Sequence, residues 1–166
     1  LAASEVLLLP SAFKTTEGQP RFRMRLAKNL LADPGGAFLA KRESQYGGYE
    51  YATRTFLDAH LKPDDLFLDI GAHWGVMALS AASRWPGRLR VLAVEPDAAN
   101  AQLLKAWAAE NGLAHVIEVV VAGCAERPGK GRLKPGGNSS MGFSVSRDEE
   151  GGLSLESIDS LLAQRP

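Results

Sequence analysis

Two acidic residues, each at the end of an apolar segment, have the types and spacing to do chemistry. Asp69 ends one apolar run and is followed by Gly71 and Gly75, four positions apart. This order is typical of a buried parallel strand that turns sharply into a helix whose N-terminus faces a ligand. Glu95 ends the next apolar run, and a carboxylate there can accept hydrogen bonds from both hydroxyls of a ribose. Together the two segments predict a site for a nucleoside-containing cofactor.

The spacing of the glycines favours one cofactor over another. Dinucleotide-binding folds usually show G-x-G-x-x-G, because a pyrophosphate must approach the backbone closely. Here the pattern is Asp69-x-Gly71-x-x-x-Gly75, without the middle glycine. S-adenosylmethionine carries an amino-acid tail and no phosphate, and Asp69 could accept a hydrogen bond from its ammonium group. The pattern therefore favours S-adenosylmethionine, with a NAD(P)-dependent oxidoreductase or a turn that binds nothing as the alternatives.

Strands and helices must alternate to position these residues. The sequence predicts an α/β fold with a parallel sheet and right-handed crossovers, because apolar runs alternate with segments of helical period. The predicted strands are Leu66–Ile70, Leu89–Glu95 and Val116–Val121, the last buried on both faces, and the predicted helices are Val76–Arg84 and Ala98–Glu110. In the second helix, Ala101, Leu104, Trp107 and Ala108 share one face.

Two flanking regions complete the prediction. Residues 1–60 are expected to form an N-terminal β/α extension, and residues 61–166 a partial cofactor-binding domain. The extension should contain a strand over 21–26, a turn over 33–36 with a return strand over 37–40, a loop over 46–50, and a helix over 53–60 with Phe56 and Leu57 inward. Downstream we expect a hairpin of 132–134 with 141–145, and a helix over 157–163.

An ordered set of motifs resembles the FkbM family of class I S-adenosylmethionine-dependent methyltransferases. The set spans about residues 46–163 and comprises Tyr49-Glu50, Asp69-Ile-Gly-Ala-His-Trp-Gly75, Val94-Glu95-Pro96-Asp97, Leu104 through Asn111-Gly112, Val121-Ala122-Gly123 and Ser157-Ile158-Asp159-Ser160-Leu161-Leu162. The resemblance implies a Rossmann-like fold and methylation of hydroxyl oxygens, with a small molecule or glycan as the acceptor.

The resemblance also implies roles for individual residues. Asp69, Gly71, Ala72, His73 and Gly75 would wrap the methionine part of S-adenosylmethionine. Glu95 would hold the ribose, with Pro96 and Asp97 beside the adenine, whose edge Ala122 and Gly123 would line, and Glu50 would help close the site. In relatives a further strand with Lys-x-Asp-x-Glu-Gly follows the segment around Asp159, whereas this chain stops at Pro166. We therefore expect an apparently truncated parallel sheet, and a non-catalytic cofactor-binding or interaction module stays an alternative.

Composition narrows the class of protein. The 166 residues include 45% hydrophobic and 23% charged residues, and 19 basic residues balance 19 acidic ones. This balance predicts no nucleic-acid partner, and the short apolar runs predict no membrane span. An uneven basic stretch over 11–42, which includes Lys14 and Arg21, is either a solvated face or a dock for an anionic partner. Cys124 is the single cysteine, which fits a cytoplasmic protein.

No residue is assigned as the catalytic base, and no cluster has the spacing of metal ligands. Of the three histidines, His73 is interpreted as a packing or cofactor residue in preference to a base, His60 as a helix-end residue and His115 as exposed. The segment Asn138-Ser139-Ser140 is interpreted as a hairpin turn in preference to a polar lid over the site. The acceptor and the oligomeric state have no signature in the sequence.

Overall fold

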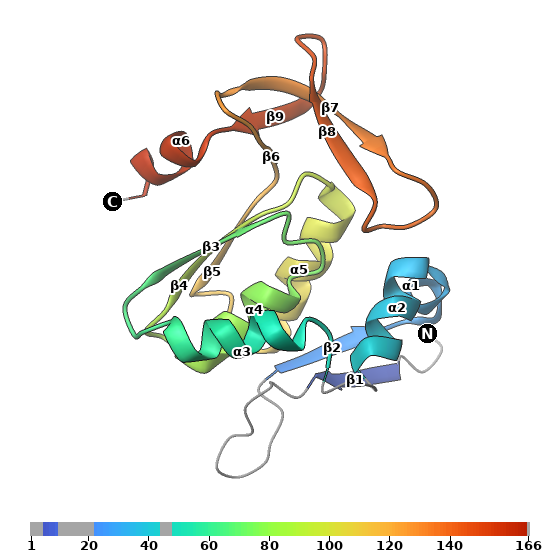
Figure 1. Cartoon of the computed structure of the whole chain (residues 1–166), viewed down its shortest axis with the longest axis vertical. Coiled ribbons are helices and arrows are strands. Elements are labelled where there is room, and N and C mark those ends of the chain that lie inside the picture. The colour runs from blue at the N-terminus through green and yellow to red at the C-terminus, as the bar shows by residue number, and fades with distance from the viewer. Residues whose placement is uncertain (1–4, 10–21, 44–47, 166) are drawn as a thin grey trace.

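A parallel sheet forms the centre of the molecule (Figure 1). The computed structural model describes residues 5–9, 22–43 and 48–165. In this part of the chain, β3 (Leu66–Ile70), β4 (Arg90–Val94) and β5 (Ile117–Val120) pair in parallel in the order β3-β4-β5. The helices α4 (Val76–Arg84) and α5 (Ala98–Glu110) connect them and have the bounds that the sequence predicts. The predicted α/β, Rossmann-like fold class is therefore confirmed.

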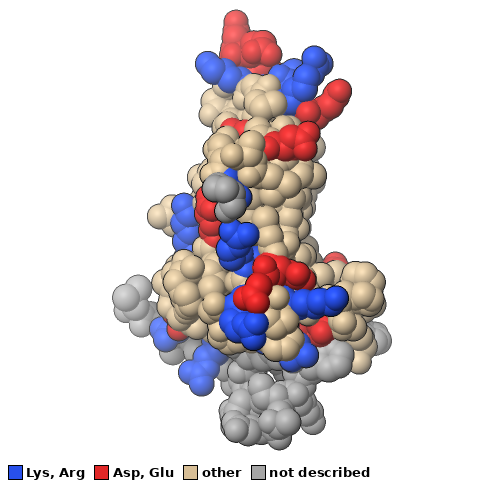
Figure 2. Space-filling view, turned by 90° about the vertical axis from the view of Figure 1, so that its left-hand side faces the viewer, with Lys and Arg blue, Asp and Glu red and all other residues tan. Residues whose placement is uncertain are grey.

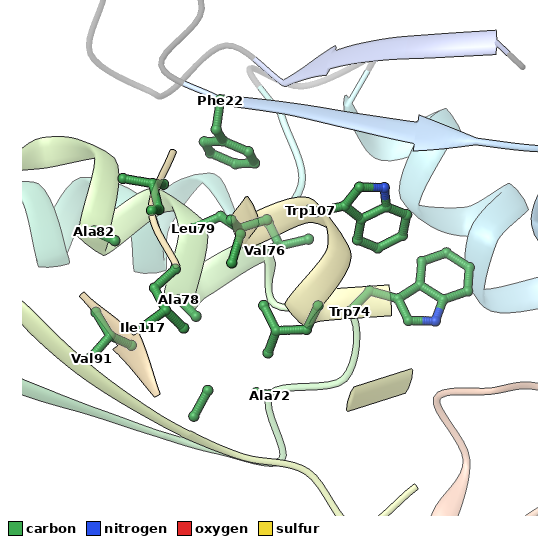
Figure 3. Close-up of a cluster of buried hydrophobic side chains, with 14 of the residues drawn as sticks. Phe22, Ala72, Trp74, Val76, Ala78, Leu79, Ala82, Val91, Trp107 and Ile117 are labelled. Carbon is green, nitrogen blue, oxygen red and sulfur yellow. The ribbon is translucent and has the colours of Figure 1, made fainter. Parts of the chain in front are cut away.

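The main hydrophobic core lies between this sheet, the two connecting helices and the N-terminal region (Figure 3). Leu104 and Trp107 of α5 are buried against Leu79 of α4, as their helical spacing predicts. Strand β2 (Phe22–Leu26) alternates buried and exposed residues, and its inward side chains Phe22 and Met24 join the same core. Strand β1 (Glu5–Leu9) pairs with β2 antiparallel. A division into 1–60 and 61–166 stays a prediction.

The predicted turn and return strand over 33–40 are wrong. The chain instead forms α1 (Lys28–Ala32) and α2 (Pro34–Glu43). The Asp33 carboxylate accepts hydrogen bonds from the backbone N–H groups of Gly35 (2.9 Å) and Gly36 (3.1 Å), so it caps α2 with Pro34 in the first helical position. A strong helix cap therefore overrides the turn preference of Pro and Gly. Residues 46 and 47 of the predicted loop, and Lys14 and Arg21, lie outside the described residues.

The predicted helix before the sheet exists as α3 (Tyr51–His60), but its predicted inward face is partly wrong. Phe56 is 59% exposed, and the helix buries Arg54 and Asp58 instead. Arg54 Nη2 lies 3.4 Å from the Glu43 carboxylate. This charged pair occupies the buried side of the helix, where the sequence analysis expects Phe56 and Leu57. Hydrophobic patterning cannot anticipate a buried ion pair between two helices.

A second, mixed sheet follows the parallel one. Strands β6 (Gly123–Cys124), β7 (Gly129–Pro135), β8 (Phe143–Arg147) and β9 (Leu153–Glu156) form a sheet in the order β6-β9-β7-β8 within the described chain, with β6 parallel to β9 and the other pairs antiparallel. The pairing of β7 with β8 confirms the predicted hairpin. Helix α6 (Ile158–Ala163) begins with a capping box in which Ser157 and Ser160 bond each other's backbone N–H groups.

The parallel sheet is less covered on its second face. Leu161 of α6 packs there with Leu92 and Val94, whereas Leu66 is 36% and Ile70 42% exposed. The expectation that β5 is buried on both faces is also wrong, since Glu118 is exposed and pairs with Arg165.

Basic and acidic side chains are intermixed on the face shown in Figure 2, so this face has no region of a single charge sign. None of the helices in the described ranges is long and apolar enough to cross a bilayer.

Candidate cofactor site

The ends of β3 and β4 open onto one cavity of about 320 Å³. Asp69 pairs with Ala93 across the two strands, which places the carboxylates of Asp69 and Glu95 at the same end of the sheet. The cavity is lined by seven of the residues that the sequence predicts for the site: Glu50, Asp69, Gly71, Ala72, His73, Glu95 and Pro96. The two acids thus share one cleft, as the cofactor hypothesis requires.

Asp69 is a buried carboxylate that the fold satisfies only in part. The backbone N–H of Ala78, in the first turn of α4, donates a hydrogen bond to it. Its Oδ2 atom is buried and has no hydrogen-bond partner among the described residues. Burial raises the pKa of Asp69 to about 6, with the bond from Ala78 opposing this rise and the nearby charge of Glu95 adding to it. Asp69 therefore needs a donor or a positive charge that the described chain does not supply.

Glu95 is also buried, with 4% exposure, but it is firmly held. Its Oε2 accepts from the backbone N–H of His73 (2.7 Å), and its Oε1 accepts from the backbone N–H of Asp97 (3.0 Å). Burial raises its pKa in spite of these hydrogen bonds. The carboxylate thereby joins the loop after β3 to the loop after β4. Oε1 also accepts from the side-chain amide of Asn100 (3.5 Å), whereas Oε2 accepts only the bond from His73 within the described chain and can accept a second one from a ligand hydroxyl.

The two glycines of the loop after β3 have different roles. Gly71 and Gly75 both adopt left-handed backbone, with φ of +74° and +82°. A Cβ on Gly71 would meet no atom within 4 Å, so this position leaves open space at the wall of the cavity. A Cβ on Gly75 would overlap the side chain of Leu104. Gly75 therefore allows α5 to pack against the loop, and it lies outside the cavity lining.

A smaller hollow of about 220 Å³ continues from the cavity. Ala122 and Gly123 line this hollow, and it shares Gly71, Pro96 and Phe143 with the main cavity. This is the place where the family resemblance expects an adenine ring. Asp97 lines neither space and instead caps α5, accepting from the backbone N–H of Asn100 at 2.8 Å.

The tip of the β7–β8 hairpin forms a wall of the cavity that the sequence analysis assigned to a turn. Ser140, Met141 and Phe143 line the cavity. The carbonyl of Ser140 accepts a hydrogen bond from the Asn100 side chain at 3.2 Å, which ties the hairpin to α5. The alternative of a polar lid at Asn138-Ser139-Ser140 is the one signal in the sequence for this wall. The spacing of residues alone could not show that the hairpin tip reaches the strand ends.

His73 is the histidine that lines the cavity in the described structure. Its backbone adopts a left-handed conformation with φ of +51°, and its ring stacks on Trp74 with the centroids 4.6 Å apart. Burial lowers its pKa to about 4, although the charges of Asp33 and Asp97 oppose this. His60 contacts the Phe56 carbonyl at the end of α3 and His115 is exposed, as predicted. The described residues contain no group of His, Cys, Asp and Glu able to hold a metal ion.

Comparison with known proteins adds similarities to fragments of methyltransferase structures. No family model and no curated protein matches the sequence. Among solved structures, geranyl diphosphate C-methyltransferase from Streptomyces coelicolor A3(2) is 26% identical with a TM-score of 0.44, and 63% of this chain is covered. Precorrin-6y C5,15-methyltransferase from Geobacter metallireducens GS-15 is 21% identical (TM-score 0.39, 45% covered), and methyltransferase FkbM from Methylobacillus flagellatus KT is 19% identical (TM-score 0.37, 61% covered). The matches span 38%, 39% and 24% of those chains, respectively.

Proposed function

We propose that this chain binds S-adenosylmethionine and takes part in methyl transfer. The observation that carries the proposal is that two carboxylates line one cavity: Asp69, which has an oxygen without a hydrogen-bond partner in the described chain, and Glu95, which is firmly held by backbone N–H groups. An ammonium group would donate to the unpartnered Oδ2 of Asp69 and neutralise its charge, which removes the cost of burying that carboxylate. Glu95 would accept from the ribose hydroxyls at its Oε2 atom, which accepts one hydrogen bond within the described chain.

The other lining residues fit the same ligand. Gly71 leaves the backbone accessible for close approach, and the hollow at Ala122 and Gly123 is bordered by Pro96 and Phe143, as a flat base requires. When bound, the cofactor supplies a methyl group already activated by its sulfonium. The chain's own contribution is to align the acceptor and to exclude water, and Met141 at the hairpin tip and Phe143 at the start of β8 contribute apolar wall to the cavity for this.

The finer part of the proposal concerns the acceptor. We propose a hydroxyl oxygen of a small molecule or glycan, which the family resemblance supports. The balanced overall charge gives no reason to expect a nucleic acid. A cytoplasmic location also stays a prediction, drawn from the single cysteine.

Calorimetric titration of the full chain tests the cofactor. S-adenosylhomocysteine should bind, and NAD⁺ should not. Glu95→Gln should weaken binding at least tenfold, since a charge-assisted hydrogen bond contributes ~1.5–3 kcal/mol. Glu126→Gln, which changes an exposed acid outside the cavity, should leave the affinity unchanged. Binding of NAD⁺ in place of S-adenosylhomocysteine would support the oxidoreductase alternative, and binding of neither would remove the proposal.

A further inference from the structure

Three segments that are far apart in the sequence meet at the hydroxyl group of Ser140. The Nε2 atom of His73, in the loop after β3, lies 2.9 Å from Ser140 Oγ. Ser140 Oγ lies 2.7 Å from Oδ1 of Asp33, the residue that caps α2, and the backbone N–H of Ser140 donates to Oδ2 of Asp33 at 3.0 Å. The hydrogen-bonded series His73–Ser140–Asp33 therefore links the cofactor loop, at the cavity wall, to the N-terminal helices.

The number of protons available in this hydrogen-bonded series fixes the tautomer of His73. Partial burial would raise the pKa of Asp33, but hydrogen bonds from Ser140, Gly36 and Gly35 outweigh this effect and lower it. Asp33 is therefore an ionised carboxylate that can only accept. A serine hydroxyl has a single proton, and Ser140 gives it to Asp33. Nε2 of His73 must then carry a proton and donate it to Ser140, which leaves the lone pair of a neutral ring on Nδ1.

We propose that His73 is the proton acceptor for the substrate hydroxyl and that its Nδ1 takes the proton. The inference rests on the proposed function, since it assigns the base for that methyl transfer. In this step the O–H bond of the acceptor breaks, its electron pair stays on the oxygen that becomes methylated, and an N–H bond forms at Nδ1. The ring then carries one positive charge until the proton leaves to solvent. Ser140 and Asp33 act as positioning residues.

The surroundings of the ring suit this role. Burial lowers the pKa of His73 to about 4, so the ring is neutral at pH 7 and Nδ1 keeps its lone pair. A base this weak takes the proton as the oxygen bonds to the methyl carbon, which makes the O–H group strongly acidic. The negative groups that face it are Asp33, through Ser140, and Asp97, while Glu95 holds its backbone N–H. These charges stabilise the protonated ring once it forms. The stacking on Trp74 and the bond to Ser140 fix the ring plane, so Nδ1 has one orientation.

Nitrogen NMR of the ¹⁵N-histidine-labelled full chain reads the tautomer directly and needs no cofactor. His73 should be protonated at Nε2 at pH 7. His60 is a built-in contrast, because its Nδ1 lies 2.8 Å from the Phe56 carbonyl, which can only accept, so His60 should be protonated at Nδ1. His73→Asn and His60→Asn assign the signals. Ser140→Ala should abolish the preference of His73. Ser139→Ala should preserve it, because the hydroxyl of this neighbouring serine accepts from the Met141 N–H and has no bond to His73 in the described structure.

Chemical modification tests whether Nδ1 is open to the cavity. Diethyl pyrocarbonate attacks accessible, unprotonated imidazole nitrogens, so peptide mass mapping of the full chain should show reaction at His73, with the exposed His115 as the positive control. A His73 protonated at Nδ1, an unchanged tautomer in Ser140→Ala, or the absence of modification at His73 would each overturn the proposal. The S-adenosylhomocysteine titration separates the two ideas, because the tautomer is defined whether or not the cofactor binds.

Discussion

Replacement of Asp69 by Asn should stabilise the fold and weaken the cofactor site. Burial raises the pKa of Asp69 from 3.8 to about 6, and one pKa unit corresponds to ~1.4 kcal/mol, so the ionised carboxylate costs about 3 kcal/mol of stability at neutral pH. Because the pKa of Asp69 is higher in the folded than in the unfolded state, the contribution of this one group to stability is greatest below pH 3.8. That contribution is lost as the pH rises through about 6. An amide at this position has no charge to bury.

The gain in stability from Asp69→Asn is reduced because the new side-chain amide needs a hydrogen-bond acceptor. The Asn oxygen can keep the hydrogen bond from the Ala78 N–H, but its amide group then lies where Oδ2 has no partner in the described structure. An unsatisfied buried donor costs ~1–3 kcal/mol. We therefore expect Asp69→Asn to be about 0–2 kcal/mol more stable than wild type at pH 7 and above, and less stable than wild type at pH 4, where the carboxyl group is protonated in the folded protein.

Urea unfolding of both proteins at intervals from pH 4 to pH 8 measures this effect. The difference between the two stabilities isolates Asp69, because all other titrating groups are shared. It should shift in favour of Asn by about 3 kcal/mol over the window from 3.8 to about 6 and then level off. A constant difference for Asp69→Asn would refute the argument that burial of this carboxylate dominates, and unchanged S-adenosylhomocysteine affinity would refute its role toward an ammonium group.

His73 should oppose Asp69 in the same pH range. Its folded pKa of about 4 lies below the ordinary 6.5, so its contribution to stability is complete above pH 6.5 and is lost as the pH falls toward 4. In wild type the two trends offset each other. Asp69→Asn should therefore reveal a stability that rises with pH over this window, which the same unfolding data will show.

Further substitutions test the separate parts of the site. Glu95→Ala should weaken S-adenosylhomocysteine binding more than Glu95→Gln by calorimetry, because it also releases the loops that the carboxylate joins. Gly71→Ala should cost ~1–2 kcal/mol in urea unfolding, from left-handed strain alone, whereas Gly75→Ala should cost more, since its Cβ also overlaps Leu104. Phe143→Ala should leave the midpoint of thermal unfolding within a few degrees of wild type but weaken cofactor binding severalfold, since this half-buried ring borders both the cavity and the hollow.

The parallel sheet could be predicted from the sequence because its signals are local. Helices α4 and α5 begin and end at the predicted residues, and strands β3 and β4 fall within a residue of the predicted bounds. Apolar period, glycine position and the acid at each strand end all lie within a few residues of one another. The parallel pairing then brings Asp69 and Glu95 together without any further information.

The remaining part of the site could not be predicted because it depends on contacts between distant segments. Ser140 and Asp33 are separated by 107 positions, and each looks like an ordinary turn or cap residue in isolation. The same holds for Arg54, whose burial beside Glu43 follows from how α2 and α3 meet. Local patterns report the neighbours of a residue in the chain, so they cannot show that a hairpin tip and a helix cap close one wall of a cavity.

Backbone strain and an unpartnered buried carboxylate oxygen occur together at this cavity, which supports its interpretation as a functional site. Among the described residues other than glycine, Glu50, Asp64 and His73 have a left-handed backbone, and two of these line the cavity. Asp69 adds a buried carboxylate oxygen without a partner. Such strain persists only where the surrounding structure enforces it, and it recurs at binding and catalytic sites. The other buried side-chain atoms without a hydrogen-bond partner in the described chain belong to Arg54, Thr55 and Arg84, outside the cavity lining. What distinguishes the cavity is that such an atom, on Asp69, lies in the same cleft as the strained backbone of Glu50 and His73.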